Sequence, residues 1–341
     1  MPQTSRELVR SCLTFESPER IPRDLWILPW ASIHFPNEVE ALKARFPSDI
    51  TKAIEVYRPS PRVVGDRYAE GLHVDEWGCV FTNVQAGCIG EVRQPILRNM
   101  SDWNQVLPPY ETLPDNQELA RNRVNQFCQE TDLFVLAACC PRPWERYQFL
   151  RGVENAMLDV LEPESGFLDL LGMIHEFHLR ELEFWSSTEV DGLMFMDDWG
   201  SQSNLLISPR YWCEFFKPLY RDYCDLGHSQ GKFVFMHSDG QISSIYEELI
   251  KVGVDALNSQ LFCMDMKDLA KKARGRITFW GEIDRQHILT SSDPQVGRNA
   301  VRKVAHHLFE PAGGLIAQFE LGLGANPETA RAIFEEWEKI L

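Results

Sequence analysis

The sequence lacks any uninterrupted apolar stretch long enough to span a bilayer, and it shows no short internal repeat or low-complexity tract. The first absence excludes a protein with membrane-spanning helices. Residues 1–20 are polar and amphipathic, without the apolar core and small-residue cleavage site of a signal peptide. We therefore expect a cytoplasmic protein that does not associate with membranes.

Basic residues are also scarce relative to acidic ones. The chain has 34 Lys and Arg against 50 Asp and Glu, which gives a formal net charge of −16. Proteins that bind nucleic acid neutralise phosphates with Lys and Arg, so we exclude nucleic acid as a partner. A polyanionic substrate would need local positive charge to offset this balance.

Paired cysteines are missing as well. The nine cysteines are scattered, and none forms a Cys-x-x-Cys pair. An odd, scattered set argues against a disulfide framework. We expect most of these residues to be small, buried and apolar.

The sequence does contain a repeated alternation of strand-like and helix-like segments. The helix-like segments between the apolar runs carry apolar residues at three- and four-residue spacing. This alternation predicts a (β/α)8 TIM barrel in a single domain, residues 1–341, with an N-terminal extension. Around glycine-containing turns, residues 74–97 alternate in polarity and predict a small antiparallel excursion. The apolar runs of strand length are residues 193–196, 233–236, 254–257, 277–280 and 315–319.

Two aspartates and a glutamine follow the first of these runs. Asp197 and Asp198 come directly after it, and Gln202 lies four residues further on. Chemistry in α/β barrels gathers where the strands end, so these three residues are candidate catalytic residues. Adjacent residues of a strand face opposite ways, so we expect one aspartate to point into the barrel mouth and the other to cap a helix.

His237 and Asp239 follow the second run. Their spacing of two places both side chains on one side if the strand conformation continues. Such a pair suits a metal site or an acid/base pair. A histidine that packs at the rim beside a helix-capping aspartate is the structural alternative.

The last two runs are followed by further polar residues in alternation. Glu282, Asp284 and Gln286 follow one, and Gln318 and Glu320 lie in the other. One face of each set could look into the barrel. We include Asp284 among the candidate catalytic residues.

Several of these segments carry a family likeness. They resemble, in order and spacing, the uroporphyrinogen decarboxylase superfamily, which includes the zinc-dependent methyltransferases that move methyl groups to and from corrinoid proteins. The likeness spans nearly the whole chain and implies the same barrel fold. The segments are DEWGCVF (75–81), RPWERYQFLRGVENAMLDVL (142–161), DDWGSQSNLLISPRYWCEFFKPLYRDY (197–223), HSDG (237–240), GVDALNSQ (253–260) and WGEIDRQHIL (280–289).

The decarboxylase branch resembles this chain less well. Its members carry an arginine-rich RQAGRY segment after the first strand, which compensates the carboxylates of the tetrapyrrole substrate. Residues 29–46 of this chain read PWASIHFPNEVEALKARF and contain no such cluster.

The methyltransferase branch implies a metal site. Its zinc is held by a His-x-Cys motif at the position of HSDG and by a second cysteine near the last strand. Here His237 matches, Asp239 stands in place of the first cysteine, and AQFELG offers Glu320. Zinc accepts imidazole and carboxylate ligands, so the resemblance implies a zinc site of His237, Asp239 and Glu320.

The function implied by the resemblance is metal-assisted methyl transfer between a small methoxy or methylamine-type substrate and a corrinoid protein. A homodimer is also expected, because dimers occur in the superfamily. A tetrapyrrole-type decarboxylase and a non-catalytic binder on the same barrel are the alternatives.

Overall fold

A parallel sheet of eight strands forms the centre of the molecule. The computed structural model describes residues 2–340. The strands follow the order β1-β11-β10-β9-β8-β7-β6-β2, and each pairing between neighbours is parallel. The two outer strands meet where the Asp49 N–H donates to the Arg23 carbonyl oxygen at 2.8 Å, so the sheet is nearly closed as a barrel. The eight strands are β1 (Arg23–Ile27), β2 (Ile50–Lys52), β6 (Phe134–Leu136), β7 (Gly192–Met196), β8 (Phe233–Ser238), β9 (Ala256–Ser259), β10 (Thr278–Trp280) and β11 (Leu315–Leu321).

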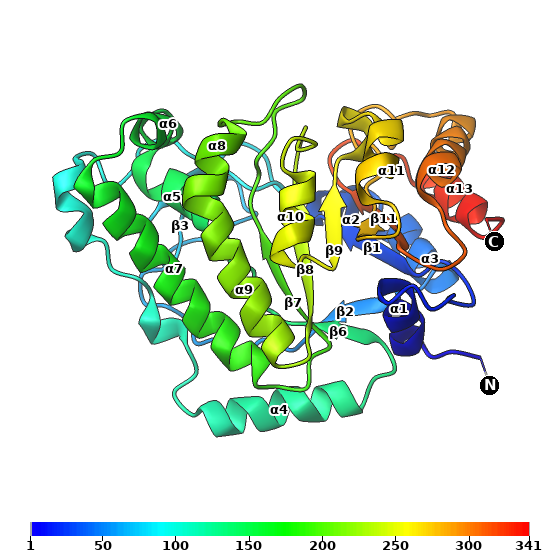
Figure 1. Ribbon diagram of the computed structural model, residues 1–341, viewed down its shortest axis with the longest axis horizontal. Coiled ribbons are helices and arrows are strands. Elements are labelled where there is room, and N and C mark those ends of the chain that lie inside the picture. The colour runs from blue at the N-terminus through cyan, green and yellow to red at the C-terminus, as the bar shows by residue number, and fades with distance from the viewer. Residues whose placement is uncertain (1, 341) are drawn as a thin grey trace.

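Helices follow the strands in turn and cover the outside of the sheet (Figure 1). This arrangement confirms the predicted (β/α)8 TIM barrel. Among residues 2–340, no helix combines the length and the apolar composition that a membrane span requires. The helices are α1 (Ser5–Leu13), α2 (Pro29–His34), α3 (Pro36–Arg45), α4 (Gln117–Gln129), α5 (Pro143–Arg151), α6 (Val153–Leu161), α7 (Ser165–Ser186), α8 (Pro209–Tyr211), α9 (Lys217–Ser229), α10 (Tyr246–Val252), α11 (Met266–Ala273), α12 (Pro294–Leu308) and α13 (Pro327–Trp337).

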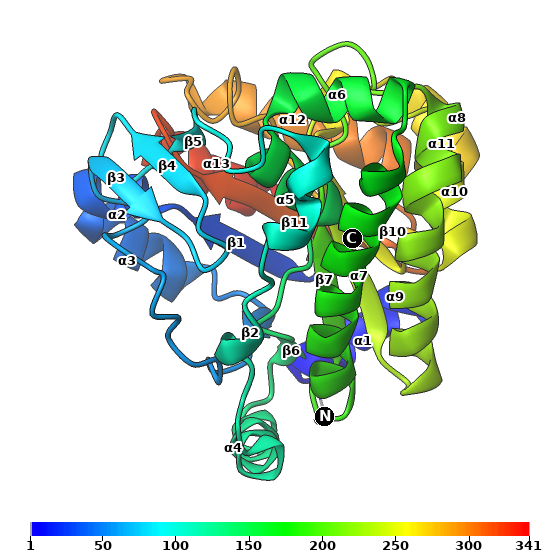
Figure 2. The same cartoon turned by 90° about the vertical axis from the view of Figure 1, so that its left-hand side faces the viewer.

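The predicted antiparallel excursion is present as a separate small sheet. It consists of β3 (Gly71–Val74), β4 (Val80–Asn83) and β5 (Glu91–Val92), paired in that order. Figure 2 shows this sheet, coloured cyan, beside α2 and apart from the barrel strands. Strand β2 has only three residues, which is too short for a recognisable alternation, and no pattern in the sequence predicts it.

Strict alternation along the strands determines which side chains enter the barrel. One apolar cluster fills the interior and includes Met194, Phe235 and Trp280, while Phe195, Met236 and Phe279 belong to the outer core under the helices. Because the side-chain period of a strand is two, every second residue beyond the interior cluster also faces inward. The polar residues that follow these strands therefore form the next level of the barrel.

Candidate active site at the barrel mouth

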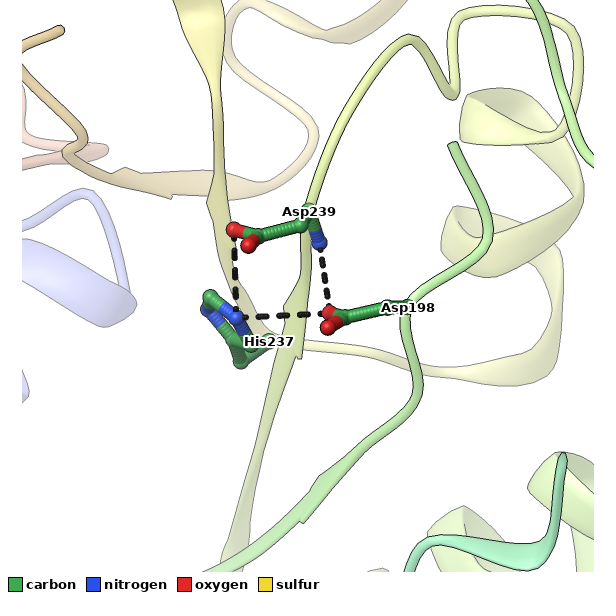
Figure 3. A group of neighbouring side chains, drawn as sticks. All are labelled: Asp198, His237 and Asp239. Carbon is green, nitrogen blue, oxygen red and sulfur yellow. Dashed lines mark hydrogen bonds and ion pairs between the residues drawn. The ribbon is translucent and has the colours of Figure 1, made fainter. Parts of the chain in front are cut away.

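Asp198, His237 and Asp239 meet at the carboxyl ends of β7 and β8 (Figure 3). The His237 Nε2 atom lies 3.6 Å from Asp198 Oδ1 and 3.4 Å from Asp239 Oδ1. The Asp239 N–H donates to Asp198 Oδ1 at 3.0 Å. One potential ligand atom from each residue lies within 4.8 Å of the others, which is close enough for all three to share one metal ion.

Asn258 determines which nitrogen of His237 carries the proton. The Asn258 Nδ2 group donates to the Trp280 carbonyl oxygen and to Gln318 Oε1, so its Oδ1 atom must be the acceptor that lies 2.6 Å from His237 Nδ1. His237 Nδ1 therefore carries the proton. In the neutral imidazole, the lone pair lies on Nε2 and points toward the two aspartates.

The electrostatics of this group favour a positive charge at its centre. His237 is only 4% exposed, and burial lowers its pKa, but the charges of Asp239 and Asp198 outweigh this effect and raise the pKa above its usual value. Burial and the charge of Asp239 raise the pKa of Asp198. Asp239 Oδ1 is buried and has no hydrogen-bond partner among residues 2–340.

Asp197 does not belong to this group, which corrects its selection as a catalytic residue. Its side chain is fully buried and faces outward from the barrel, toward α5. The carboxylate accepts hydrogen bonds from the Trp144 and Glu145 N–H groups at 3.0 and 2.8 Å and from the Tyr220 hydroxyl at 2.6 Å. Asp197 is the helix-capping member of the aspartate pair.

Glu320 also lies outside the group, because Arg285 occupies the space between them. Arg285 Nη1 donates to Glu320 Oε1 at 2.9 Å, and Nη2 forms an ion pair with Asp239 Oδ2. The structure therefore does not bring the predicted ligand Glu320 to His237 and Asp239. Asp198 lies there instead, and the Arg285 guanidinium pairs with Glu320.

Glu282 extends the acidic level of the barrel. It is 2% exposed, and neither carboxyl oxygen has a hydrogen-bond partner among residues 2–340. Its Oε1 atom lies 3.8 Å from Arg285 Nε. Burial raises the pKa of Glu282 to about 8, so the carboxyl group is largely protonated at neutral pH.

The raised pKa of Glu282 predicts that stability falls as pH increases. Between pH 4.5, the ordinary glutamate value, and about pH 8, the folded protein retains a proton that the unfolded chain has lost. The free energy of unfolding is therefore expected to decline across this window. Urea unfolding from pH 5 to pH 8 should show this decline in the wild type, and Glu282→Gln, which cannot ionise, should show a smaller one. Equal slopes for both proteins would contradict the prediction.

Two cavities adjoin residues that act on the Asp198, His237 and Asp239 group. The first, the aromatic cavity, has a volume of about 710 Å³ and lies beside the end of β6 and the start of α5. Glu145 lines it and lies close enough to the group that the charges of Asp198 and His237 act on its pKa. The aromatic walls of this cavity are Tyr57, Trp77, Phe81, Phe149 and Phe177.

The second cavity, the amide cavity, has a volume of about 300 Å³ and lies beyond Arg285, at the ends of β9 and β10. The candidates Gln202 and Asp284 line this cavity rather than contacting His237. Asp284 Oδ1 accepts the Gln286 and His287 N–H groups, which shapes the turn after β10. The polar residues that line the amide cavity are Gln202, Gln260, Cys263, Glu282, Asp284, Arg285, Gln286 and His287.

Sequence reasoning missed Glu145, Asn258 and Arg285 as parts of the site. Asn258 was detectable in principle, because it is a polar residue directly after the apolar run 254–257. Glu145 lies in the first turn of α5, where an acidic residue is ordinary, and Arg285 lies in a polar loop. Nothing in the local pattern distinguishes those two.

Comparisons with known proteins agree with this architecture. A methyltransferase from Methanosarcina mazei superposes with a TM-score of 0.72 at 12% identity, covering 99% of each chain. An endoxylanase from a sugarcane soil metagenome gives a TM-score of 0.43 at 8% identity, covering 95% of this chain and 99% of its own. No curated protein sequence matches the chain. The model of the family described as "Uroporphyrinogen decarboxylase (URO-D)" matches residues 75–339, and the chain therefore belongs to the uroporphyrinogen decarboxylase family.

Proposed function

We propose that this protein is a methyltransferase that moves a methyl group between a small methoxy or methylamine-type substrate and a corrinoid carried by a partner protein, with a divalent metal ion, zinc by preference, at the barrel mouth. The observation that carries the proposal is the convergence of Asp198, His237 and Asp239 on one point. The fold shared with a methyltransferase supports the reaction class, and the family supports an enzyme of this superfamily.

The donor set fits a divalent cation. The proton on His237 Nδ1 leaves the Nε2 lone pair free for a metal, and the hydrogen bond to Asn258 holds the ring in that orientation. Asp239 Oδ1, buried and without a partner, supplies a second ligand atom, and Asp198 Oδ1 supplies a third. Imidazole and carboxylate donors suit zinc.

Each residue of the group has a role in methyl transfer. When bound, the metal would polarise the oxygen or nitrogen atom that carries the methyl group, as a Lewis acid does. Asp198, His237 and Asp239 would hold it, while the aromatic cavity would bind the apolar body of the substrate and exclude water. Glu145 lines that cavity, and its carboxyl group can bind a substrate N–H or O–H group.

Both cavities adjoin residues that act on this group. Glu145 lines the aromatic cavity and interacts electrostatically with Asp198 and His237, and Arg285 lines the amide cavity and pairs with Asp239. Two separate cavities near one group suit a reaction with two ligands. Methyl transfer is such a reaction, because donor and acceptor must meet.

The decarboxylase alternative is less well supported by the charges of the site. Residues 29–46, where decarboxylases of the family carry their arginines, form α2 and α3 here, and their only arginine, Arg45, pairs with Glu338. Arg146, which lines the aromatic cavity, is paired with Asp75 and Glu76. Arg142 lies beside Glu145, and the three arginines of this cavity, Arg67, Arg142 and Arg146, face the four acids Asp75, Glu76, Glu145 and Glu181. This balance does not favour a substrate with many carboxylates. Anaerobic incubation with uroporphyrinogen should therefore give little coproporphyrinogen, and efficient conversion would favour the decarboxylase.

The metal prediction is tested by removing His237. Purified wild-type protein reconstituted with zinc should hold about one equivalent, and His237→Ala should bind zinc about 100-fold more weakly or worse, because it loses a direct ligand. Asn258→Ala should weaken binding by about 10–100-fold, because it releases the ring orientation. His228→Ala is the matched control, since His228 pairs with Asp255 on the surface and is 41% exposed.

The transfer reaction is tested with the same proteins. Zinc-loaded wild type is expected to methylate cob(I)alamin from at least one compound in a panel of methoxy and methylamine substrates, followed by the absorbance change of the corrinoid. His237→Ala should lose this activity, and His228→Ala should retain it. Zinc content below a tenth of an equivalent in well-folded wild type after reconstitution would overturn the metal site.

A further inference from the structure

The amide cavity contains a buried polar group that the proposed reaction does not use. Glu282 lines this cavity, is 2% exposed, and has two carboxyl oxygens without a hydrogen-bond partner among residues 2–340. Buried polar groups are nearly always hydrogen-bonded, because leaving them unpaired is costly. An unpaired carboxyl group at the wall of a cavity therefore indicates a ligand that pairs with it.

Amide side chains form much of the remaining wall. The Gln202 Nε2 group donates to Gln286 Oε1 at 2.9 Å. Gln260 Oε1 accepts the Gly240 N–H at 3.0 Å. These bonds occupy the two oxygens, and the structure gives the Nε2 groups of Gln260 and Gln286 no acceptor within residues 2–340. Gln260 and the exposed Gln286 thus bring two N–H donors to the cavity that Glu282 also lines.

The charges around the cavity favour a neutral ligand. Arg285 lines the cavity and carries a permanent positive charge, which repels a second cation. Asp284 lines the same cavity and disfavours an anion. A neutral group that both donates and accepts hydrogen bonds fits these walls best.

We propose that the amide cavity binds the primary carboxamide group of a ligand. The carboxamide oxygen accepts hydrogen bonds from the free Gln260 and Gln286 N–H groups, and its N–H group donates to Glu282. None of Asp198, His237 and Asp239 lines this cavity, so the site is distinct from the group around His237. The carboxamide could belong to a small free amide or to one of the side chains at the rim of a corrin ring.

Three small probes of different charge test the proposal directly. Ligand-observed NMR titrations would compare propionamide, propionate and propylammonium on the zinc-free protein, so the measurement does not depend on catalysis or on the metal. Propionamide is expected to bind at least about threefold to tenfold more tightly than the other two, which corresponds to one or two hydrogen bonds. Preferential binding of propylammonium or of propionate, or no binding of propionamide, would overturn the proposal.

Variants of Glu282 separate recognition from folding. Glu282→Ala should weaken propionamide binding by about threefold to tenfold, and Glu282→Gln should retain it, because a glutamine also offers a donor and an acceptor. Gln286→Ala should weaken binding similarly, whereas Gln295→Ala, a surface glutamine on α12, should not. Unchanged binding by well-folded Glu282→Ala, or loss of binding by well-folded Glu282→Gln, would contradict the assignment.

A second pair of probes identifies the source of the carboxamide. Dicyanocobinamide carries corrin carboxamides, and the corresponding corrin with free carboxylates is its control. If Glu282→Ala weakens the binding of dicyanocobinamide but not of the corrin with free carboxylates, the ligand is a corrin side chain. This result is expected if the proposed function holds. If neither corrin binds but propionamide does, the cavity serves a small free amide. In that case the carboxamide site stands and the corrinoid partner does not.

Discussion

Replacing Arg285 with alanine is expected to lower the free energy of unfolding by about 3 kcal/mol, because removing one partner of a buried ion pair leaves its charges uncompensated. Arg285 pairs with Asp239 and Glu320 and lies near Glu282, whose side chains are 22%, 14% and 2% exposed. Without the guanidinium, these acids face one another. Urea unfolding at pH 7 would measure the loss.

Arg62→Ala is the matched control for this prediction. The Arg62 side chain is 29% exposed, close to the 26% of Arg285, but its partner Glu111 is 32% exposed. Surface pairs of this kind contribute about 0–1 kcal/mol. If Arg285→Ala costs no more than Arg62→Ala, Arg285 is not the counter-ion that holds the acidic level together.

The Arg285→Ala variant also tests the proposed metal site. Removing Arg285 frees Asp239 Oδ2 and Glu320, and a divalent cation would replace the lost positive charge. Zinc is therefore expected to restore part of the stability that Arg285→Ala loses. No change with zinc would indicate that the freed acids recruit no metal.

Asp197 and Asp198 are adjacent in the sequence but should respond to alanine in opposite ways. Asp197→Ala is expected to cost about 3–4 kcal/mol of stability, because it leaves the Trp144 and Glu145 N–H groups and the Tyr220 hydroxyl without their acceptor. Asp198→Ala should cost about 1 kcal/mol or less. Its side chain is 39% exposed and accepts one hydrogen bond from the Asp239 N–H.

Zinc binding and methyl transfer should be affected more by Asp198→Ala than by Asp197→Ala. Asp198→Ala removes a proposed metal ligand and is expected to lose zinc binding and methyl transfer while keeping its fold. Asp197→Ala, at temperatures where it remains folded, should still bind zinc through the intact group. Thermal unfolding and zinc titration of the two variants would separate the roles, and equal stability losses would contradict the assignment of Asp197 as a cap.

Much of the site follows from the alternation of side chains along the strands. Period-two spacing puts His237 and Asp239 on the same face as Phe235, and it puts Asp198 on the face of Met194. It also requires that Asp197 face outward, although spacing alone does not reveal which of the two aspartates is inward. The structure shows that Asp198 is the inward aspartate, because Met194, four residues before it on the same face, belongs to the interior cluster.

The sequence did not reveal that Asp198, rather than Glu320, lies beside His237 and Asp239. Glu320 lies at the end of β11 and Asp239 at the end of β8, and the barrel order places β9 and β10 between them. Residues on strands that are not neighbours meet only through a side chain long enough to cross the mouth, and Arg285 has this length. A loop residue of this kind carries no periodic signal.

The sequence alone determined the barrel, because buried parallel strands must be apolar throughout and the helices between them must be amphipathic. It also determined that polar side chains gather where those strands end. Only the tertiary structure decided the partners of each charge: Arg285 for Glu320, Asn258 for His237, and the N-terminus of α5 for Asp197. These contacts join residues far apart in the chain, and their energies depend on burial and distance, which spacing along a sequence does not specify.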